Sequence, residues 1–326
     1  MEIFVSLLLI IVGFVLLIKG ADYLVNGASS LAKRFNASDI AIGLTVVAMG
    51  TSAPELVVNL ISGAKGANDV VFGNIIGSNI FNMFLILGLA AVIYPITVQK
   101  NALWKEVPYS LAITVVFWVL VNDKLLFGAE ANEATAIDGI ILLVLFVIFL
   151  VYVFLNMSKG GSDSVIDEAE DIELYGSVKT TVLIVVGIAG LAFGGQMIVD
   201  NAIKIAESFG VSQRLIGLTI LAAGTSLPEL ATTAVAAFHK KSDLAVGNII
   251  GSNIFNLLLV LGATAVFNSP LSFDTVLNTD LYIVMLGTVL LFLFMFTFNK
   301  YKLDRVEGGV FLLGFVAYMV FLFQRL

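Results

Sequence analysis

The sequence predicts an all-α membrane protein with ten transmembrane helices in two inverted five-helix repeats. Composition is the first observation behind this prediction: 59% of the 326 residues are apolar and only 13% are charged, whereas a typical soluble domain has about 25% charged residues. The second is a mean hydropathy of +1.03. The third is a duplication, because the segment GNIIGSNIFN occupies 73–82 and returns unchanged at 247–256.

A span is predicted wherever about 20 largely apolar residues follow one another, the length that crosses a bilayer. The first span begins close to the N-terminus. We interpret it as a helix that stays in the protein and not as a signal peptide, because it lacks a basic leading segment and a small-residue cleavage site. The ten predicted spans are 3–29, 38–63, 70–94, 106–122, 136–156, 178–203, 212–237, 244–267, 279–298 and 307–324.

A polar stretch divides these spans into two groups of five. We expect 1–156 to form the first repeat, 157–177 an acidic linker, and 178–326 the second repeat. A repeat with an odd number of spans ends on the face opposite its start, so the second must run upside down, as in many secondary transporters. The acidic linker lacks the spacing and glycine of an EF-hand loop, so we expect a solvated connection.

Basic residues predict the orientation, because cytoplasmic loops are richer in Lys and Arg. With these spans, 11 of the 17 basic residues fall on one side of the membrane and 5 on the other, while Lys19 lies within the first span. We therefore expect a plasma-membrane protein with both termini extracellular and the central linker cytoplasmic.

Each repeat carries a proline-containing motif inside an apolar run. Gly50–Glu55 reads GTSAPE and Gly224–Glu229, 174 residues later, reads GTSLPE. Proline breaks the helix and frees a carbonyl, and irregular backbone at membrane depth must line a cavity or be packed in protein. An intramembrane carboxylate marks a functional site. Carboxylate, hydroxyl and carbonyl oxygens suit Ca²⁺ and the similarly hard Na⁺.

The duplicated decapeptide adds oxygen atoms to the same predicted site. Asn74, Ser78 and Asn82 are four residues apart, so they share one face of a helix. The second copy repeats this face with Asn248, Ser252 and Asn256. We expect Asn74 and Asn248 to brace the site without binding an ion.

The predicted charge of the site suggests exchange. If Glu55 and Glu229 converge, they bring two negative charges, and the carboxamides nearby add none. One Ca²⁺ would neutralise the pair, whereas the empty carboxylates would repel each other at low dielectric. A carrier of this kind should cross between its two access states only when cations fill it.

The two repeated blocks, 43–88 and 217–262, resemble those of the cation/calcium exchanger superfamily, and specifically the prokaryotic type of Na⁺/Ca²⁺ exchanger. The resemblance covers nearly the whole chain. It implies ten helices, of which the first and sixth slide across the core to switch access. It also implies that Na⁺ and Ca²⁺ are transported and that no cofactor is needed. It further implies Ca²⁺ ligation by Glu55, Glu229, Thr51 and Thr225. For Na⁺ and the central site it implies Ala48, Ser52, Ser78, Asn82, Ala222, Ser226, Ser252 and Asn256.

An antiporter driven by H⁺ or K⁺ that moves Ca²⁺ or another divalent cation is the alternative. The neutral Asn256 stands where some prokaryotic and K⁺-dependent members carry Asp, which disfavours K⁺ coupling and favours an electrogenic Na⁺ cycle. The proton-coupled branch carries a glutamate where this chain has Gly77 and Gly251, which disfavours H⁺ coupling.

Other function classes fit less well. Two inverted halves argue against a channel pore, and no enzyme motif is evident. The net charge of −7 disfavours nucleic-acid binding, and no obligate protein partner is evident beside the lipid bilayer. We expect the single histidine, His239, in a solvated loop. For Lys19 and Asp22 we expect a local ion pair or side chains that extend to the membrane surface.

Overall fold

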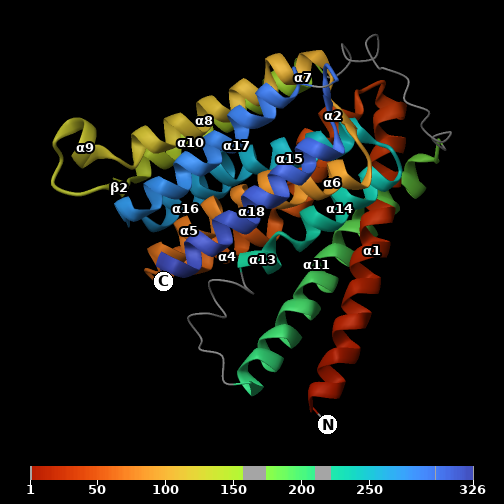
Figure 1. Cartoon of the computed structure of the whole chain (residues 1–326), viewed down its shortest axis with the longest axis horizontal. Helices are drawn as coiled ribbons and strands as arrows, with labels where there is room; N and C mark the ends of the chain where they lie inside the picture. Colours follow the sequence, from red (N-terminus) through yellow and green to blue (C-terminus); the bar gives the residue numbers. More distant parts are fainter. Residues whose placement is uncertain (1, 157–173, 210–221, 298, 326) are drawn as a thin grey trace.

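The computed structural model describes residues 2–156, 174–209, 222–297 and 299–325, which are almost entirely helical (Figure 1). Within these ranges eight helices are long and apolar enough to cross a membrane, and one bent helix pair could form a ninth span. The predicted span 212–237 lies partly outside the described residues. The protein is thus a predominantly helical, multi-pass membrane protein, and the count of ten spans stays a prediction.

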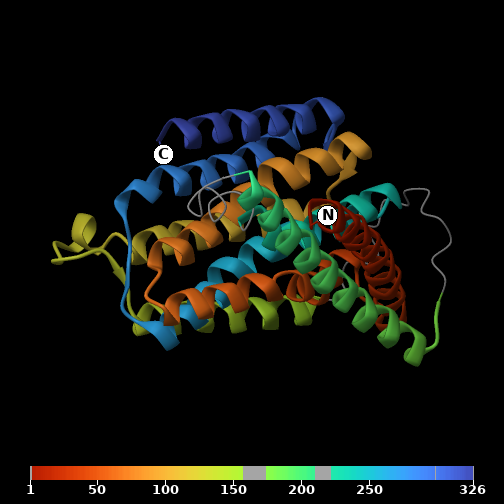
Figure 2. The same cartoon turned by 90° about the horizontal axis from the view of Figure 1, so that it is seen from below.

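Helices α1 (Glu2–Phe35) and α11 (Ser177–Ser208) lie side by side and lean away from the other helices (Figures 1 and 2). Both are longer than their predicted spans, 3–29 and 178–203. The apolar stretch fixes only the part of a helix that matches the hydrocarbon core. Polar residues at the ends can continue the helix beyond it, as the basic last turn of α1 does.

Glycines make the close crossing of α1 and α11 possible. A Cβ atom added to Gly20 would lie 2.8 Å from the carbonyl oxygen of Gly187, and one added to Gly187 would lie 2.9 Å from that of Gly20. Gly194 and Gly13 face each other in the same way, because a Cβ added to Gly194 would lie 2.7 Å from the carbonyl oxygen of Gly13. Small residues let membrane helices approach to backbone contact, so this pair depends on them.

A bent helix precedes each buried central helix. In the first half it consists of α2 (Asp39–Ile42), the π-helical segment η1 (Gly43–Val47), α3 (Ala48–Thr51) and α4 (Ala53–Ala64). The axis turns by 46° between the last two of these. In the second half the described counterparts are α13 (Ala222–Thr225) and α14 (Leu227–Phe238).

Two central spans form the middle of the molecule. The first consists of α5 (Asn68–Ile80), π-helical η2 (Phe81–Ile86) and α6 (Leu87–Ile93). The second consists of α15 (Ser242–Phe255), π-helical η5 (Asn256–Val260) and α16 (Leu261–Asn268). In their apolar stretches 72% and 83% of the residues are buried, against 17–33% in the other long helices. These two spans therefore face protein, and the others face lipid on one side.

The remaining helices cover the centre from outside. They are α7 (Lys100–Trp104), α8 (Glu106–Leu120), α9 (Asp123–Phe127), α10 (Ala136–Asn156), 3₁₀-helix η6 (Thr275–Leu277), α17 (Asn278–Phe294) and α18 (Arg305–Arg325). A Cβ on Gly139 of α10 would lie 2.7 Å from the oxygen of Gly262 in α16, and one on Gly88 of α6 would lie 3.0 Å from that of Gly308 in α18. Each half therefore covers a central span of the other.

Short strand pairs and a polar network tie the ends of the helices together. Strand β1 (Ile96–Thr97) pairs antiparallel with β4 (Lys302–Leu303), and β2 (Glu133–Ala134) with β3 (Leu271–Ser272).

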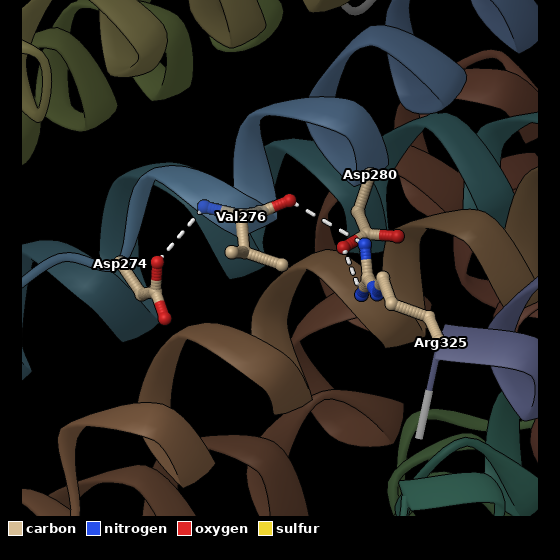
Figure 3. A network of polar contacts seen from close by, with 4 residues as sticks. All are labelled: Asp274, Val276, Asp280 and Arg325. Carbon is tan, nitrogen blue, oxygen red and sulfur yellow. Dashed lines mark hydrogen bonds and ion pairs between the residues drawn. The ribbon is translucent and has the colours of Figure 1, made fainter.

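At the start of α17 the guanidinium of Arg325 lies 2.7 Å from the carboxylate of Asp280 and donates to the carbonyl of Val276 at 3.4 Å (Figure 3). The Asp274 carboxylate caps η6 by accepting from the N–H of Val276 at 2.9 Å. The end of α18 is thereby fixed to the start of α17.

We expect Gly187→Leu to destabilise the folded protein by about 1–3 kcal/mol, because the added side chain would push α11 away from α1. Gly309→Leu is the matched control, since a Cβ on this α18 residue would meet no described atom within 4 Å. Melting temperatures of the purified variants check this expectation. Equal stability of the two variants would show that the close crossing is not required.

Candidate functional site

Glu55 and Glu229 occupy equivalent places in the two halves. Each is the third residue of its helix, α4 or α14, and each follows a proline. Both side chains have no exposed surface, and the serine just before each helix lies beside the carboxylate of the other half. The structure therefore brings together the two carboxylates that the sequence singles out. Their position in the first turn is favourable, because the N-terminal end of a helix attracts negative charge.

Serine and proline produce the bend before each glutamate. Ser52 has φ −82° and ψ 5°, and Ser226 has φ −87° and ψ 6°, so neither has the helical ψ of its neighbours. Pro54 and Pro228 have no N–H, so the carbonyl four residues earlier in each half loses its helical donor. One main-chain oxygen in the turn before each bend is thus left without its helical donor.

Each carboxylate accepts a hydrogen bond from the serine at the other bend. Ser52 Oγ donates to Glu229 Oε1 at 3.1 Å, and Ser226 Oγ lies 3.4 Å from Glu55 Oε1. The two contacts are related by the 174-residue offset of the sequence repeat. Neither carboxylate is therefore held by its own half alone.

Ser78 and Ser252, the serines of the duplicated decapeptide, lie beside the same groups. Ser78 Oγ is 3.0 Å from Ser226 Oγ, and Ser252 Oγ is 3.5 Å from Glu229 Oε1. Both side chains are buried. The four predicted serines thus gather around the two carboxylates.

Thr51 and Thr225 are held by asparagines of the opposite half. The hydroxyl of Thr51 lies 3.2 Å from Asn248 Oδ1, and that of Thr225 lies 3.1 Å from Asn74 Oδ1. The amino group of each asparagine donates to a further side chain in its own half. These contacts suit the bracing role expected for Asn74 and Asn248.

The two predicted alanines would act through main-chain oxygens only. The carbonyl of Ala48 accepts the N–H of Ser52 at 2.9 Å, and the hydroxyl of Thr51 lies 3.3 Å from the same oxygen. Ala222 is the first residue of α13. Both lie one turn before the bends of their halves.

A cluster of four carboxamides lies in the middle of the central spans. Asn82 Nδ2 donates to Asn253 Oδ1 at 3.0 Å, and Asn256 Nδ2 donates to Asn79 Oδ1 at 3.1 Å. Asn82 and Asn256 lie in the π-helical segments η2 and η5, a conformation that occurs often at functional sites. Together these four residues are called the carboxamide cluster below.

Asn79 and Asn253 are members of this cluster that sequence reasoning missed. That reasoning followed the helix face on which residues recur every four positions, and these two asparagines lie off it. The signal that could have found them is their own recurrence, 174 residues apart, inside the duplicated decapeptide.

Four buried oxygens of the site have no hydrogen-bond donor among the described residues. They are Glu55 Oε2, Glu229 Oε2, Asn82 Oδ1 and Asn256 Oδ1. A buried acceptor without a partner is destabilising by about 1–3 kcal/mol, and by more when it is charged. A bound cation would satisfy all four. Among the described residues no three His, Cys, Asp or Glu side chains are arranged so that they could hold a metal ion, so the site combines two charges with neutral oxygens.

A cavity of about 310 Å³ leads toward the site between α11 and the two bends. Its walls include Pro54, Gln196, Thr225 and Pro228. It therefore reaches the prolines of both halves and one of the predicted Ca²⁺ ligands.

The opposite flank of the site is covered by α1, which packs along α14. Here His239 Nε2 lies 3.0 Å from Asp22 Oδ1, and both side chains are only partly exposed. His239 lies in the turn after α14 but is less solvated than expected, and Asp22 contacts it instead of pairing with Lys19, because the packing of α1 on α14 brings two residues 217 positions apart into contact. Nothing in the sequence indicates a contact between two residues so far apart in the chain.

Comparisons with known proteins agree with this geometry. The sodium/calcium exchanger protein family matches residues 5–155 and 179–324. CaxA of Alkalimonas amylolytica, named as a proposed antiporter, is 39% identical over 325 residues, which are 98% of this chain and 99% of CaxA. The sodium/calcium exchanger MaX1 of Methanosarcina acetivorans is 33% identical over 349 residues, covering 98% of this chain and 99% of MaX1.

A solved structure gives the same result for the fold. The sodium-calcium exchanger NCX_Mj, soaked with zero Na⁺ and Ca²⁺, superposes with a TM-score of 0.83 at 32% identity, covering 98% of this chain and 99% of that one. The family consists of membrane antiporters that exchange Na⁺ and Ca²⁺. On the evidence of the family match and of relatives that span its whole length, the chain belongs to the sodium/calcium exchanger family.

Proposed function

We propose that this protein exchanges Na⁺ for Ca²⁺ across the cell membrane by alternating access, in an electrogenic cycle. The observation that carries the proposal is the pair Glu55 and Glu229, two fully buried carboxylates from different halves, each with an oxygen that has no partner among the described residues. Two buried negative charges need compensation by a positive charge. One Ca²⁺, or a set of Na⁺ ions, provides it.

The ligands follow the chemistry of the site. Ca²⁺ would bind the carboxylates of Glu55 and Glu229 with main-chain oxygens of Thr51 and Thr225, because Ca²⁺ takes about 6–8 hard oxygens. Asn82 and Asn256 would complete the centre. The Na⁺ sites would use hydroxyls and carbonyls of the remaining predicted residues, namely Ala48, Ser52, Ser78, Ala222, Ser226 and Ser252.

Repulsion between the carboxylates couples the ions to each other. An empty site keeps two like charges together at low dielectric, which opposes the closure needed for crossing. Ca²⁺ or Na⁺ removes this repulsion, so the carrier moves when loaded. More than two Na⁺ for each Ca²⁺ would leave net charge to move across the membrane, which makes the cycle electrogenic.

The proposed architecture has ten spans in two inverted halves, 1–156 and 178–326, joined by the linker 157–177. Its support is the recurrence of elements in the same order and of hydrogen bonds in pairs 174 residues apart. We infer that α1 and α11 slide across the other helices to switch access. In this structure α1 packs on α14, and α11 packs on α3, α13 and α14 beside the cavity.

Replacing either glutamate by glutamine should lower Ca²⁺ transport at least about 100-fold. A unit-charge pair 4 Å apart at an effective dielectric near 20 contributes about 4 kcal/mol, and every 1.4 kcal/mol is tenfold in affinity. Glu106→Gln is the matched control, since this buried carboxylate bonds Tyr152 at 2.9 Å, outside the site. Flux of radioactive Ca²⁺ into vesicles measures the effect, and normal flux in Glu55→Gln or Glu229→Gln would refute the assignment.

The driving ion can be identified with vesicles that hold one gradient at a time. Vesicles loaded with Na⁺ and diluted into Na⁺-free buffer should take up Ca²⁺, and a membrane potential should change the rate. H⁺ or K⁺ gradients alone should drive little uptake. Uptake that follows the H⁺ or K⁺ gradient and ignores Na⁺ would replace the proposed coupling with the alternative one.

The proposed orientation can be tested with single cysteines, because the natural chain has none. Lys65 and Lys300 are both exposed and are assigned to opposite faces. In intact cells a membrane-impermeant maleimide should label Lys65→Cys, and it should label Lys300→Cys only after permeabilisation. The reverse pattern would place both termini in the cytoplasm.

A further inference from the structure

We propose that Asn79 and Asn253 are positioning residues of the cation site, which hold the carboxamides of Asn256 and Asn82 with their oxygens toward the ion. The inference deepens the proposed function and depends on it, because it presumes that Asn82 and Asn256 bind a cation. It adds two residues that do not themselves face the ion.

The contacts are reciprocal and cross between the halves. The amino group of Asn82 in η2 donates to Asn253 Oδ1 of α15 at 3.0 Å, and that of Asn256 in η5 donates to Asn79 Oδ1 of α5 at 3.1 Å. All four side chains are at most 1% exposed. Water therefore cannot replace either partner.

The orientation of a carboxamide decides whether it can bind a cation. Its oxygen accepts, while its amino group donates two hydrogen atoms and would repel a cation. The two ends are nearly equal in size, so packing alone does not select between them. A fixed acceptor on the amino side selects the orientation, and in this structure the oxygens of Asn82 and Asn256 are the ends left without a partner.

Asn79 is itself fixed by the opposite half. Its amino group donates to the main-chain carbonyl of Asn253 at 3.4 Å, which turns its oxygen toward Asn256. Asn253 differs, because its amino group has no acceptor among the described residues. It is held through its oxygen alone, so Asn253 and Asn82 depend on each other for their orientation.

A packing role for these asparagines makes a different prediction from a positioning role. If Asn253 only filled space, its replacement would weaken ion binding to the same extent whichever central carboxamide is present. If it acts through Asn82, its effect must disappear once Asn82 has no carboxamide to orient. Residues that share a hydrogen bond show such non-additive effects, whereas independent residues do not.

The test is a set of double variants in the full-length protein. Asn253→Leu keeps the volume of the side chain and removes the acceptor. It is made alone, with Asn82→Ser, and with Asn256→Ser, because serine keeps an oxygen but has no amino group. Na⁺ binding is measured as the Na⁺ concentration that gives half of the maximal rise in melting temperature, so the readout does not require transport.

We expect Asn253→Leu to raise this Na⁺ concentration about tenfold in the natural background, which corresponds to about 1.4 kcal/mol. With Asn256→Ser the tenfold effect should remain, since the side chain of Asn253 bonds that of Asn82 and not that of Asn256. With Asn82→Ser it should fall below about twofold. The same factor in both backgrounds, or coupling to Asn256 instead of Asn82, would overturn the proposal.

Asn79→Leu repeats the test with the two backgrounds exchanged, and it decides the question if Asn253→Leu does not fold. Its effect should vanish with Asn256→Ser and persist with Asn82→Ser. The proposed function is checked in the same assay by the unmodified protein. Absence of stabilisation by both Na⁺ and Ca²⁺ would contradict that function, whereas stabilisation without the predicted coupling would contradict only the positioning role.

Discussion

The burial of two carboxylates within the membrane-spanning part of the protein is the constraint that the rest of the structure has to satisfy. An ionised carboxylate moved out of water loses several kcal/mol even after the protein relaxes around it. Glu55 and Glu229 have no exposed surface, so their charge must be compensated locally. Helix N-termini and serine hydroxyls from the opposite half do this in part. A cation bound between the two halves would compensate the remaining charge. The site can therefore close tightly only when a cation occupies it.

The scaffold around this pair is built for close approach. The central spans carry the polar groups and are the most buried, while outer helices of the other half cover them at glycine contacts such as Gly139 with Gly262. The bends at Ser52 and Ser226 free one main-chain oxygen in the turn before each of them. The π-helical segments begin at or one residue before Asn82 and Asn256. Irregular backbone occurs where it faces protein, as the absence of water in the membrane requires.

Much of this arrangement could be predicted from the sequence, because the signals involved are local. Long apolar runs located the helices, and the Pro54 and Pro228 motifs located the bends. The identical decapeptides pointed to the residues that gather around the carboxylates. What could not be predicted depends on how the two halves meet: the bonds that Asn79 and Asn253 make, and the contact of His239 with Asp22. Such pairs are set by helix packing between residues more than 170 positions apart. A single sequence does not show which residues of two such distant helices lie opposite each other.

The contacts between the halves come as matched pairs: Ser52 with Glu229 and Ser226 with Glu55, Asn82 with Asn253 and Asn256 with Asn79. In each pair, a residue of one half contacts a residue of the other, and their two equivalents make the same contact in reverse. This is the pattern of an isologous two-fold interface. Two copies of one half, associated as an antiparallel homodimer, would make each of these two kinds of bond twice and enclose the same pair of carboxylates. A gene of half this length would therefore already encode every side chain needed for these contacts around the two carboxylates, and fusing two such genes would let each half diverge while keeping them.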